Sequence, residues 1–180
     1  MMHAHTHAHT RAAEGGGAAL ALESRRKRQR QRGFSMSARD DAGDPLAHRQ
    51  TDHSPATGNA LQCCVATILR MSSLDAVPNF IKAADPYAVL RAFLADKGLG
   101  FVKIELDAHG RMPFYPGDCD VVVAGPSPRG DFRHAVVGRL RDASSRIPHL
   151  VFDPHESDAF FNGKPAAWVG LFVALRPWAN

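Results

Sequence analysis

The sequence of 180 residues predicts one α+β domain, with N-terminal helices packed on a mostly antiparallel sheet. The length supports a single domain, because domains usually hold about 100–200 residues. Two segments with apolar residues at helical spacing come first in the patterned part of the chain. About five short segments rich in β-branched and aromatic residues follow, separated by turn signals.

The first 45 residues differ in composition from the rest, and we expect them to form a disordered tail. They contain alternating histidines, three consecutive glycines and the basic run RRKRQRQR, which offer little apolar surface for a core. The histidines lack the partners that orient metal ligands, so we expect no metal site there. Punctuated apolar segments start near Gln50, and the predicted domain covers residues 46–180.

The tail also holds the chain's excess of positive charge. Residues 1–36 carry seven Lys or Arg and two Glu, a net charge of +5, whereas the whole chain has +4 and residues 37–180 therefore have −1. We accordingly expect no nucleic-acid partner for the folded part, and any such contact would be made by the tail alone.

The hydropathy pattern predicts no membrane partner. No apolar run approaches the roughly 18 residues that a membrane-spanning helix needs. The short apolar piece at residues 18–22 precedes the basic cluster, which is the reverse of the order in a secretory signal. We therefore expect a cytoplasmic protein. We also expect a monomer.

The three cysteines indicate neither a disulfide framework nor a zinc site. Cys63 and Cys64 are adjacent, and Cys119 is distant from them. This count and spacing match no metal-binding pattern, and we expect no metal and no cofactor. Cys119 stands at the start of a predicted strand, where no helix dipole activates it, and we expect a buried, inert thiol.

Two helices are predicted. The first covers residues 60–71, with candidate caps at residues 57–59. Its apolar stripe consists of Leu61, Cys64, Val65, Ile68 and Leu69. The second begins after Asp85 as N-cap, has Pro86 in its first turn and ends before Gly98. Its inner face consists of Val89, Leu90, Phe93 and Leu94.

Five strands are predicted after the helices, because β-branched and aromatic residues dominate these segments. They cover residues 101–106, 120–125, 134–140, 149–153 and 168–175. Turn signals at residues 107–110, 126–130 and 142–145 separate several of them.

Three residues in or near these segments could form the site of a cysteine hydrolase. Such a site needs a thiolate, a base, a group that orients the base, and donors for the oxyanion. Papain-like folds place the nucleophile at the start of the first long helix and take the other groups from later strands. His134 begins one predicted strand and Asp153 ends the next, so the two can be neighbours on an antiparallel hairpin. Gln50 lies before the first helix, where its amide could point into an oxyanion site.

Three segments resemble a family of small bacterial and phage papain-like cysteine peptidases, which is related to the bacteriocin-processing double-glycine peptidases. The segments read QTDHSPATGNALQCCVATILRMSSLDAVPNF, GPSPRGDFRHAVVGR and VFDPHESD. In that family the first contains Gly-Asn/Asp-Cys-x-x-x-Cys before an apolar helix, the second His-Ala/Ser-Val-Val and the third Asp-Pro-His. The resemblance covers residues 49–175 in the family's order, and it implies a papain-like fold and a peptide or protein substrate.

The resemblance also implies roles for individual residues. His134 takes the place of the general base, Asp153 that of its orienting carboxylate, and Gln50 that of the oxyanion-side glutamine. The second cysteine of the motif corresponds to Cys64, which we expect to be structural. The first cysteine, the nucleophile, corresponds to Ala60.

Ala60 departs from the family pattern at the nucleophile, and a methyl group cannot attack a carbonyl. The chain should therefore be inactive by this mechanism. Three explanations stay open: an engineered inactivation, a natural pseudoenzyme, or a nucleophile moved to Cys63. Cys63 lies close to one helical turn further on, at about 4.5 Å along the helix axis, and so would miss the helix N-terminus.

Each site residue also has a structural interpretation. His134 could be a hydrogen-bonded core histidine, Asp153 could open a turn before a proline, and Gln50 could be a loop residue. His155 is expected at the surface or the rim of the site, and Arg129 is either a turn residue or a cation that faces the substrate.

Two function classes follow from these residues. The first is a papain-like cysteine hydrolase scaffold that acts on a peptide or isopeptide amide and is inactive because of Ala60. Deamidases and transglutaminases use the same thioester chemistry, so the residues do not separate them from peptidases. The second is a non-catalytic module that binds a peptide or protein partner in the same cleft.

The contrast in composition predicts a domain boundary that proteolysis can detect. Trypsin should cut within about residues 11–45 and leave a stable core, because an unstructured basic segment is open to the protease. Mass spectrometry of the fragments locates the cuts. A full-length chain that resists trypsin at RRKRQRQR would contradict the prediction.

Overall fold

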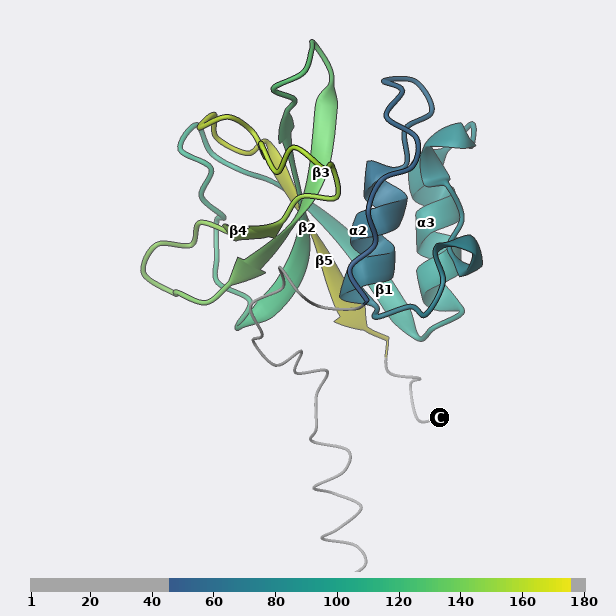
Figure 1. The fold of residues 1–180 in the computed structure, drawn as a ribbon. Helices are drawn as coiled ribbons and strands as arrows, with labels where there is room; N and C mark the ends of the chain where they lie inside the picture. The colour runs from purple at the N-terminus through teal and green to yellow at the C-terminus, as the bar shows by residue number, and fades with distance from the viewer. Residues whose placement is uncertain (1–45, 176–180) are drawn as a thin grey trace, which may run out of the picture. The chain divides into compact units, whose positions relative to one another are not determined.

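The computed structural model describes residues 46–175; the predicted tail at residues 1–45 lies outside the described residues (Figure 1). Helix α2 covers Ala60–Ile68 and α3 covers Pro86–Ala95, with the short 3₁₀ helices η2 (Leu74–Ala76) and η3 (Phe80–Lys82) between them. The strands are β1 (Leu99–Glu105), β2 (Cys119–Pro126), β3 (Arg133–Leu140), β4 (His149–Phe152) and β5 (Trp168–Ala174). Within residues 46–175, no helix has the length and apolar character to cross a membrane.

The strands form one sheet in the order β1-β5-β2-β3-β4, and every neighbouring pair is antiparallel. β5 comes last in the chain but lies between β1 and β2. β2 and β3 are a hairpin in which Cys119 pairs with Leu140 and Pro126 with Arg133. The two helices and this sheet confirm the predicted α+β class and its antiparallel strands.

The two helices begin in different ways. Asp85 caps α3, because its Oδ1 accepts a hydrogen bond of 2.9 Å from the N–H of Ala88, and Pro86 stands in the first turn as predicted. α2 starts after Asn59, which stands at the predicted cap position, but its side chain makes no cap hydrogen bond, contrary to the prediction. α2 ends at Ile68, short of the predicted residue 71, because the chain leaves helical geometry at Arg70, where φ is 52°.

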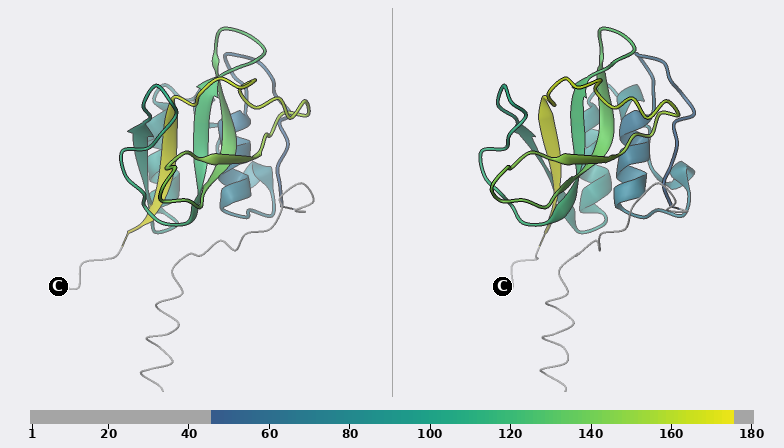
Figure 2. Two further views of the ribbon diagram at one scale, coloured as in Figure 1. Left: turned by 90° about the vertical axis from the view of Figure 1, so that its left-hand side faces the viewer. Right: turned by 60° about the vertical axis from the view of Figure 1, so that its left-hand side comes forward.

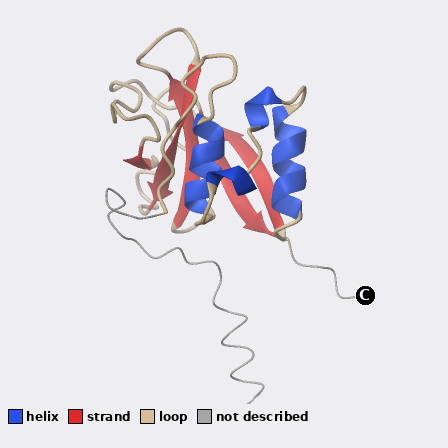
Figure 3. Cartoon of the chain, turned by 45° about the vertical axis from the view of Figure 1, so that its right-hand side comes forward, coloured by secondary structure: helices blue, strands red, loops and turns tan. Residues whose placement is uncertain are grey.

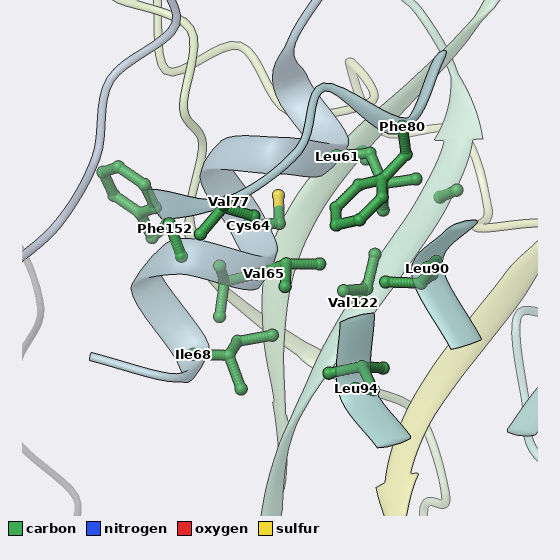
Figure 4. Close-up of a cluster of buried hydrophobic side chains, with 14 of the residues drawn as sticks. Leu61, Cys64, Val65, Ile68, Val77, Phe80, Leu90, Leu94, Val122 and Phe152 are labelled. Carbon is green, nitrogen blue, oxygen red and sulfur yellow. The ribbon is translucent and has the colours of Figure 1, made fainter. Parts of the chain in front are cut away.

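Both helices pack on one face of the sheet, as Figure 3 shows. Cys64, Val65 and Ile68 of α2 lie together with Leu90 and Leu94 of α3 in the core that fills this layer (Figure 4). The predicted stripe of α2 is buried except for the half-buried Leu69, and Cys63 and Ala66 outside the stripe are buried as well. On α3, Val89 and Phe93 are half-buried and pack against the same core.

The opposite face of the sheet carries a second, smaller core. The loops before β2 and before β5 cover this face (Figure 2) and contribute Met112 and Phe161 to it. Phe161 packs over Gly125 of β2, where a Cβ would approach the Phe161 ring to 3.0 Å. A side chain at position 125 would therefore require the ring of Phe161 to shift.

Removing side-chain volume from the core between the helices and the sheet should destabilise the domain. Leu90 is 0% exposed, so Leu90→Ala should lower the free energy of unfolding by about 2–5 kcal/mol, because it leaves a cavity. Val102→Ala is the control, since Val102 is 42% exposed and should cost less than about 1 kcal/mol. Urea unfolding measures both, and equal losses would contradict the assigned core.

Candidate active site

A buried histidine–carboxylate pair joins the start of β3 to the end of β4. Nε2 of His134 lies 2.6 Å from Oδ1 of Asp153, and the two side chains are 3% and 0% exposed. Oδ1 of Asp153 also accepts the N–H of His155 at 2.9 Å, and Oδ2 accepts the N–H of Phe160 at 2.8 Å. The structure thus brings together the two residues that the sequence nominated as base and orienting carboxylate.

These contacts keep Asp153 ionised. Burial by itself raises the pKa of Asp153. The hydrogen bonds from His134 and from the backbone N–H groups of His155 and Phe160 together lower it by more than burial raises it, so the pKa lies below its ordinary value. An ionised carboxylate only accepts hydrogen bonds, so Nε2 of His134 must carry a proton. Nδ1 is then the ring nitrogen that is left for the pocket that His134 lines.

Arg49 and Gln50 attach the loop before α2 to the segment that follows β4. Nη1 of Arg49 donates to the carbonyl oxygens of Asp153 at 2.8 Å and of His155 at 3.0 Å. The backbone N–H of Gln50 donates to the carbonyl oxygen of Pro154 at 2.8 Å. Segments about one hundred positions apart in the sequence therefore meet at the site.

Asn59 holds the loop that leads from Gln50 into α2. Its side chain is buried, and its Oδ1 accepts the N–H groups of Thr51 at 3.2 Å and of Asp52 at 3.1 Å. Its Nδ2 donates to Oγ1 of Thr51 at 3.0 Å. Because Asn59 turns back to the loop, the first N–H groups of α2, beginning with Ala60, have no side-chain cap and stay available to a ligand.

Gln50 lines the pocket, and one of the two hydrogens of its amide is already in use. Its Nε2 donates one hydrogen to the carbonyl oxygen of Asp52 at 3.0 Å, which leaves the second hydrogen for another acceptor. Its Oε1 is buried and has no hydrogen-bond partner among the described residues. A buried carbonyl oxygen without a donor costs about 1–3 kcal/mol, so a bound donor at this place would be stabilising.

Gln50, Ala60 and His134 line one pocket of about 400 Å³, within the usual range of ligand sites. In Figure 1, the loop before α2 and the loop between β2 and β3 lie at the same end of the fold. The start of α2 and the start of β3 therefore face the pocket together. Ala60 stands at the first position of α2, where the nucleophile is expected.

The rest of the pocket is largely apolar. Ala124 pairs with Ala135 on one side and with Trp168 on the other, so these three neighbours lie on the helix side of the sheet. The methyl groups of Ala124 and Ala135 leave space in the pocket that larger side chains would fill. The remaining apolar wall is made of Pro55, Leu61, Ile81, Pro86, Tyr87 and Phe132.

Two further histidines lie at the polar end of the pocket. The rings of His53 and His155 meet edge to face with centroids 4.6 Å apart, and the ring of His155 lies 6.5 Å from that of His134. Burial lowers the pKa of His155, and the positive charges of Arg129 and His53 lower it further. Both His155, which was expected at the surface or the rim, and Arg129, which was expected in a turn or facing the substrate, line the pocket.

The three cysteines do not line the pocket. Cys63 is fully buried, its thiol donates to the carbonyl oxygen of Arg49 at 3.4 Å, and burial raises its pKa to about 12. Cys64 lies in the core, and burial raises its pKa well above the ordinary value. Burial raises the pKa of Cys119 to about 11. The geometry therefore gives no support to Cys63 as the alternative nucleophile.

Sequence reasoning missed His53, Asn59 and the aromatic part of the wall. His53 lies inside the QTDH stretch, and Asn59 directly precedes Ala60, so both stood next to quoted site residues. Tyr87 and Trp168 gave no comparable signal, because they open a helix and a strand and resemble ordinary core residues. Only the packing of α3 against the sheet brings them to the pocket.

Neither a metal site nor a known relative adds to this geometry. Across the described part of the chain, no group of three or more His, Cys, Asp or Glu side chains is arranged to hold a metal ion. No family model, curated protein or solved structure matches the chain. The function is therefore inferred from the site itself.

The lowered pKa of Asp153 predicts a pH-dependent contribution to stability. The stabilisation is fully present above the unfolded-state pKa of about 3.9 and is lost as the pH falls through the folded-state value. Asp153→Asn should lower the free energy of unfolding near neutral pH by at least about 1–3 kcal/mol, since buried donors lose their carboxylate. The deficit should shrink as the pH falls below about 4.

Denaturant unfolding at several pH values measures this effect. Asp131→Asn is the matched control, because Asp131 is exposed and should change the free energy of unfolding by less than about 0.5 kcal/mol at each pH. A deficit for Asp153→Asn that stays constant down to acidic pH would show that the charge of Asp153 is not what stabilises the site.

Proposed function

We propose that this chain is a papain-like cysteine hydrolase scaffold in which Ala60 occupies the position of the nucleophile. One observation carries the proposal: the buried His134–Asp153 pair and the uncapped start of α2 at Ala60 face the same pocket. A helix start lowers the pKa of a thiol placed there, and a neighbouring imidazole holds or accepts its proton.

Each group has a distinct part in that chemistry. Asp153 holds the imidazole of His134 through Nε2. Nδ1 would therefore accept the proton of a thiol and later donate it to the leaving amine. The backbone N–H of Ala60 and the second hydrogen on Nε2 of Gln50 are the donors for an oxyanion. The peptide or isopeptide substrate binds along the apolar wall.

As the sequence stands, the scaffold lacks the group that attacks the carbonyl. The methyl group of Ala60 has no lone pair, and Cys63 is buried outside the pocket with a raised pKa. The chain should therefore show no amide hydrolysis by a thioester route. A hydrolytic side reaction that depends on Cys63 would contradict this part of the proposal.

A second candidate function is the binding of a peptide or protein without catalysis. The observation that favours it is the pocket itself, which combines aromatic walls with a few polar groups, as in most ligand sites. The two functions use the same cleft and differ only in whether a thiol at position 60 belongs to the active form.

Ala60→Cys tests the hydrolase proposal. The new thiol should react with iodoacetamide at about pH 6–7 faster than Cys63, Cys64 or Cys119, because the start of α2 and His134 both favour its thiolate. A further His134→Ala change should remove the fast reaction. Mass spectrometry of the labelled peptides measures the rates, and a gain of amide hydrolysis towards peptides is the second readout.

Ala95→Cys is the matched control for this experiment. Ala95 is exposed at the end of α3, where the helix dipole disfavours a thiolate, so its labelling should be slow below neutral pH. If the thiol introduced at position 60 labels no faster than a free thiol of pKa about 8.5, the hydrolase proposal fails.

A further inference from the structure

The pocket carries charge of one sign only. Arg129 and Arg133 line it together with three histidines, and none of its lining residues is Asp or Glu. Residues 46–175 hold thirteen Lys or Arg and thirteen Asp or Glu, so the excess of arginine over carboxylate is a property of the pocket rather than of the domain. Such a pocket attracts an anion.

Asp153 and Asp158, two carboxylates of the segment after β4, are already engaged by other groups. Both oxygens of Asp153 accept hydrogen bonds, and its side chain is 0% exposed. Asp158 forms an ion pair of 2.8 Å with Arg49. Nη1 of Arg129 donates at 3.0 Å to the neutral hydroxyl of Ser157, and within residues 46–175 neither Arg129 nor Arg133 forms an ion pair.

Ala60 makes room for an anion where the thiolate of an active enzyme would lie. A thiolate at this position would be stabilised by the start of α2 and by His134. With a methyl group in its place, those donors remain and their anion is missing. An oxygen of a ligand can take that position, provided that the ligand also suits the apolar wall.

We infer that the pocket binds a peptide by its free C-terminal carboxylate, with a large apolar last side chain against Tyr87 and Trp168. The inference rests on the proposed function, because such a peptide has the form of the acid that amide hydrolysis at this site would release. The carboxylate lies between the first N–H groups of α2 and Nδ1 of His134, and the ring of His134 is the imidazolium in this complex, so that Nδ1 donates to the carboxylate while Nε2 donates to Asp153. The unpartnered Oε1 of Gln50 accepts an N–H group of the peptide backbone.

Calorimetry with the full chain at about pH 6.5 tests this inference. The probe is acetyl-Ala-Ala-Phe with a free carboxylate, which should bind at least about tenfold more tightly than the same peptide with a C-terminal amide. Acetyl-Ala-Ala-Ala with a free carboxylate should bind more weakly, because it leaves the aromatic wall bare. Acetyl-Ala-Phe-Asp-amide separates a side-chain carboxylate from a terminal one, and it should bind no better than the amide.

Matched variants connect the preference to the named groups. Ala60→Asp places a fixed carboxylate in the anion position and should remove the preference for the acid, whereas Ala60→Asn is of equal size and uncharged and should retain more of it. Arg133→Gln should weaken acid binding, while Arg91→Gln should not, because Arg91 lies on α3 outside the pocket lining.

Histidine NMR gives a readout that does not depend on the variants. Arg129 and His53 lower the pKa of His155 in the free protein, and a bound carboxylate opposes their charge. The pKa of His155 should therefore rise when the acid peptide binds and should not rise with the amide.

The outcomes separate this inference from the hydrolase proposal. Equal affinity for acid and amide, or no binding of either, would overturn the inference even if Ala60→Cys creates a reactive thiol. A clear preference for the acid together with an unreactive thiol in Ala60→Cys would uphold carboxylate binding and remove the hydrolase proposal. Tighter binding of the aspartate peptide than of the terminal acid would also overturn the inference.

Discussion

The buried carboxylate of Asp153 is the group on which the arrangement of the site depends. An ionised carboxylate without water is very unfavourable unless charged or polar donors surround it. Asp153 has three such donors, namely the ring of His134 and the backbone N–H groups of His155 and Phe160. The side chain of Asp153 thus fixes the ring of His134 on β3 relative to the segment that follows β4.

That constraint extends to the start of α2. Arg49 donates to the backbone of the segment that Asp153 organises, and Gln50 pairs with Pro154 in the same segment. The side chain of Asn59 accepts hydrogen bonds from the loop that leads into α2, and it therefore does not cap the helix. An N-cap typically stabilises a helix by about 1 kcal/mol. α2 lacks this stabilisation, and in return the loop before it is fixed and its first N–H groups are left without a side-chain cap.

The elements of this domain were predictable wherever the signals are local. Asp85 and Pro86 mark the start of α3 by themselves, and the strand segments lie within two residues of the observed bounds. The order of the strands was not predictable, because the position of β5 between β1 and β2 follows from packing between distant segments. The pairing of His134 with Asp153 could be anticipated, since their strands are consecutive. The orientation of the Gln50 and Asn59 side chains could not be predicted, because each can form hydrogen bonds with several backbone groups of the loop.

The position of β5 also governs when the pocket can exist. The hairpin of β2 and β3 is local and can form as soon as both strands have left the ribosome, but β1 has β5 as its partner and must wait for it. Pairings between such distant segments form slowly. Trp168, which lines the pocket, is the first residue of β5, so the aromatic wall is completed only when this strand is inserted. A chain that is still being synthesised therefore has His134 and Asp153 before the aromatic wall of the pocket is complete.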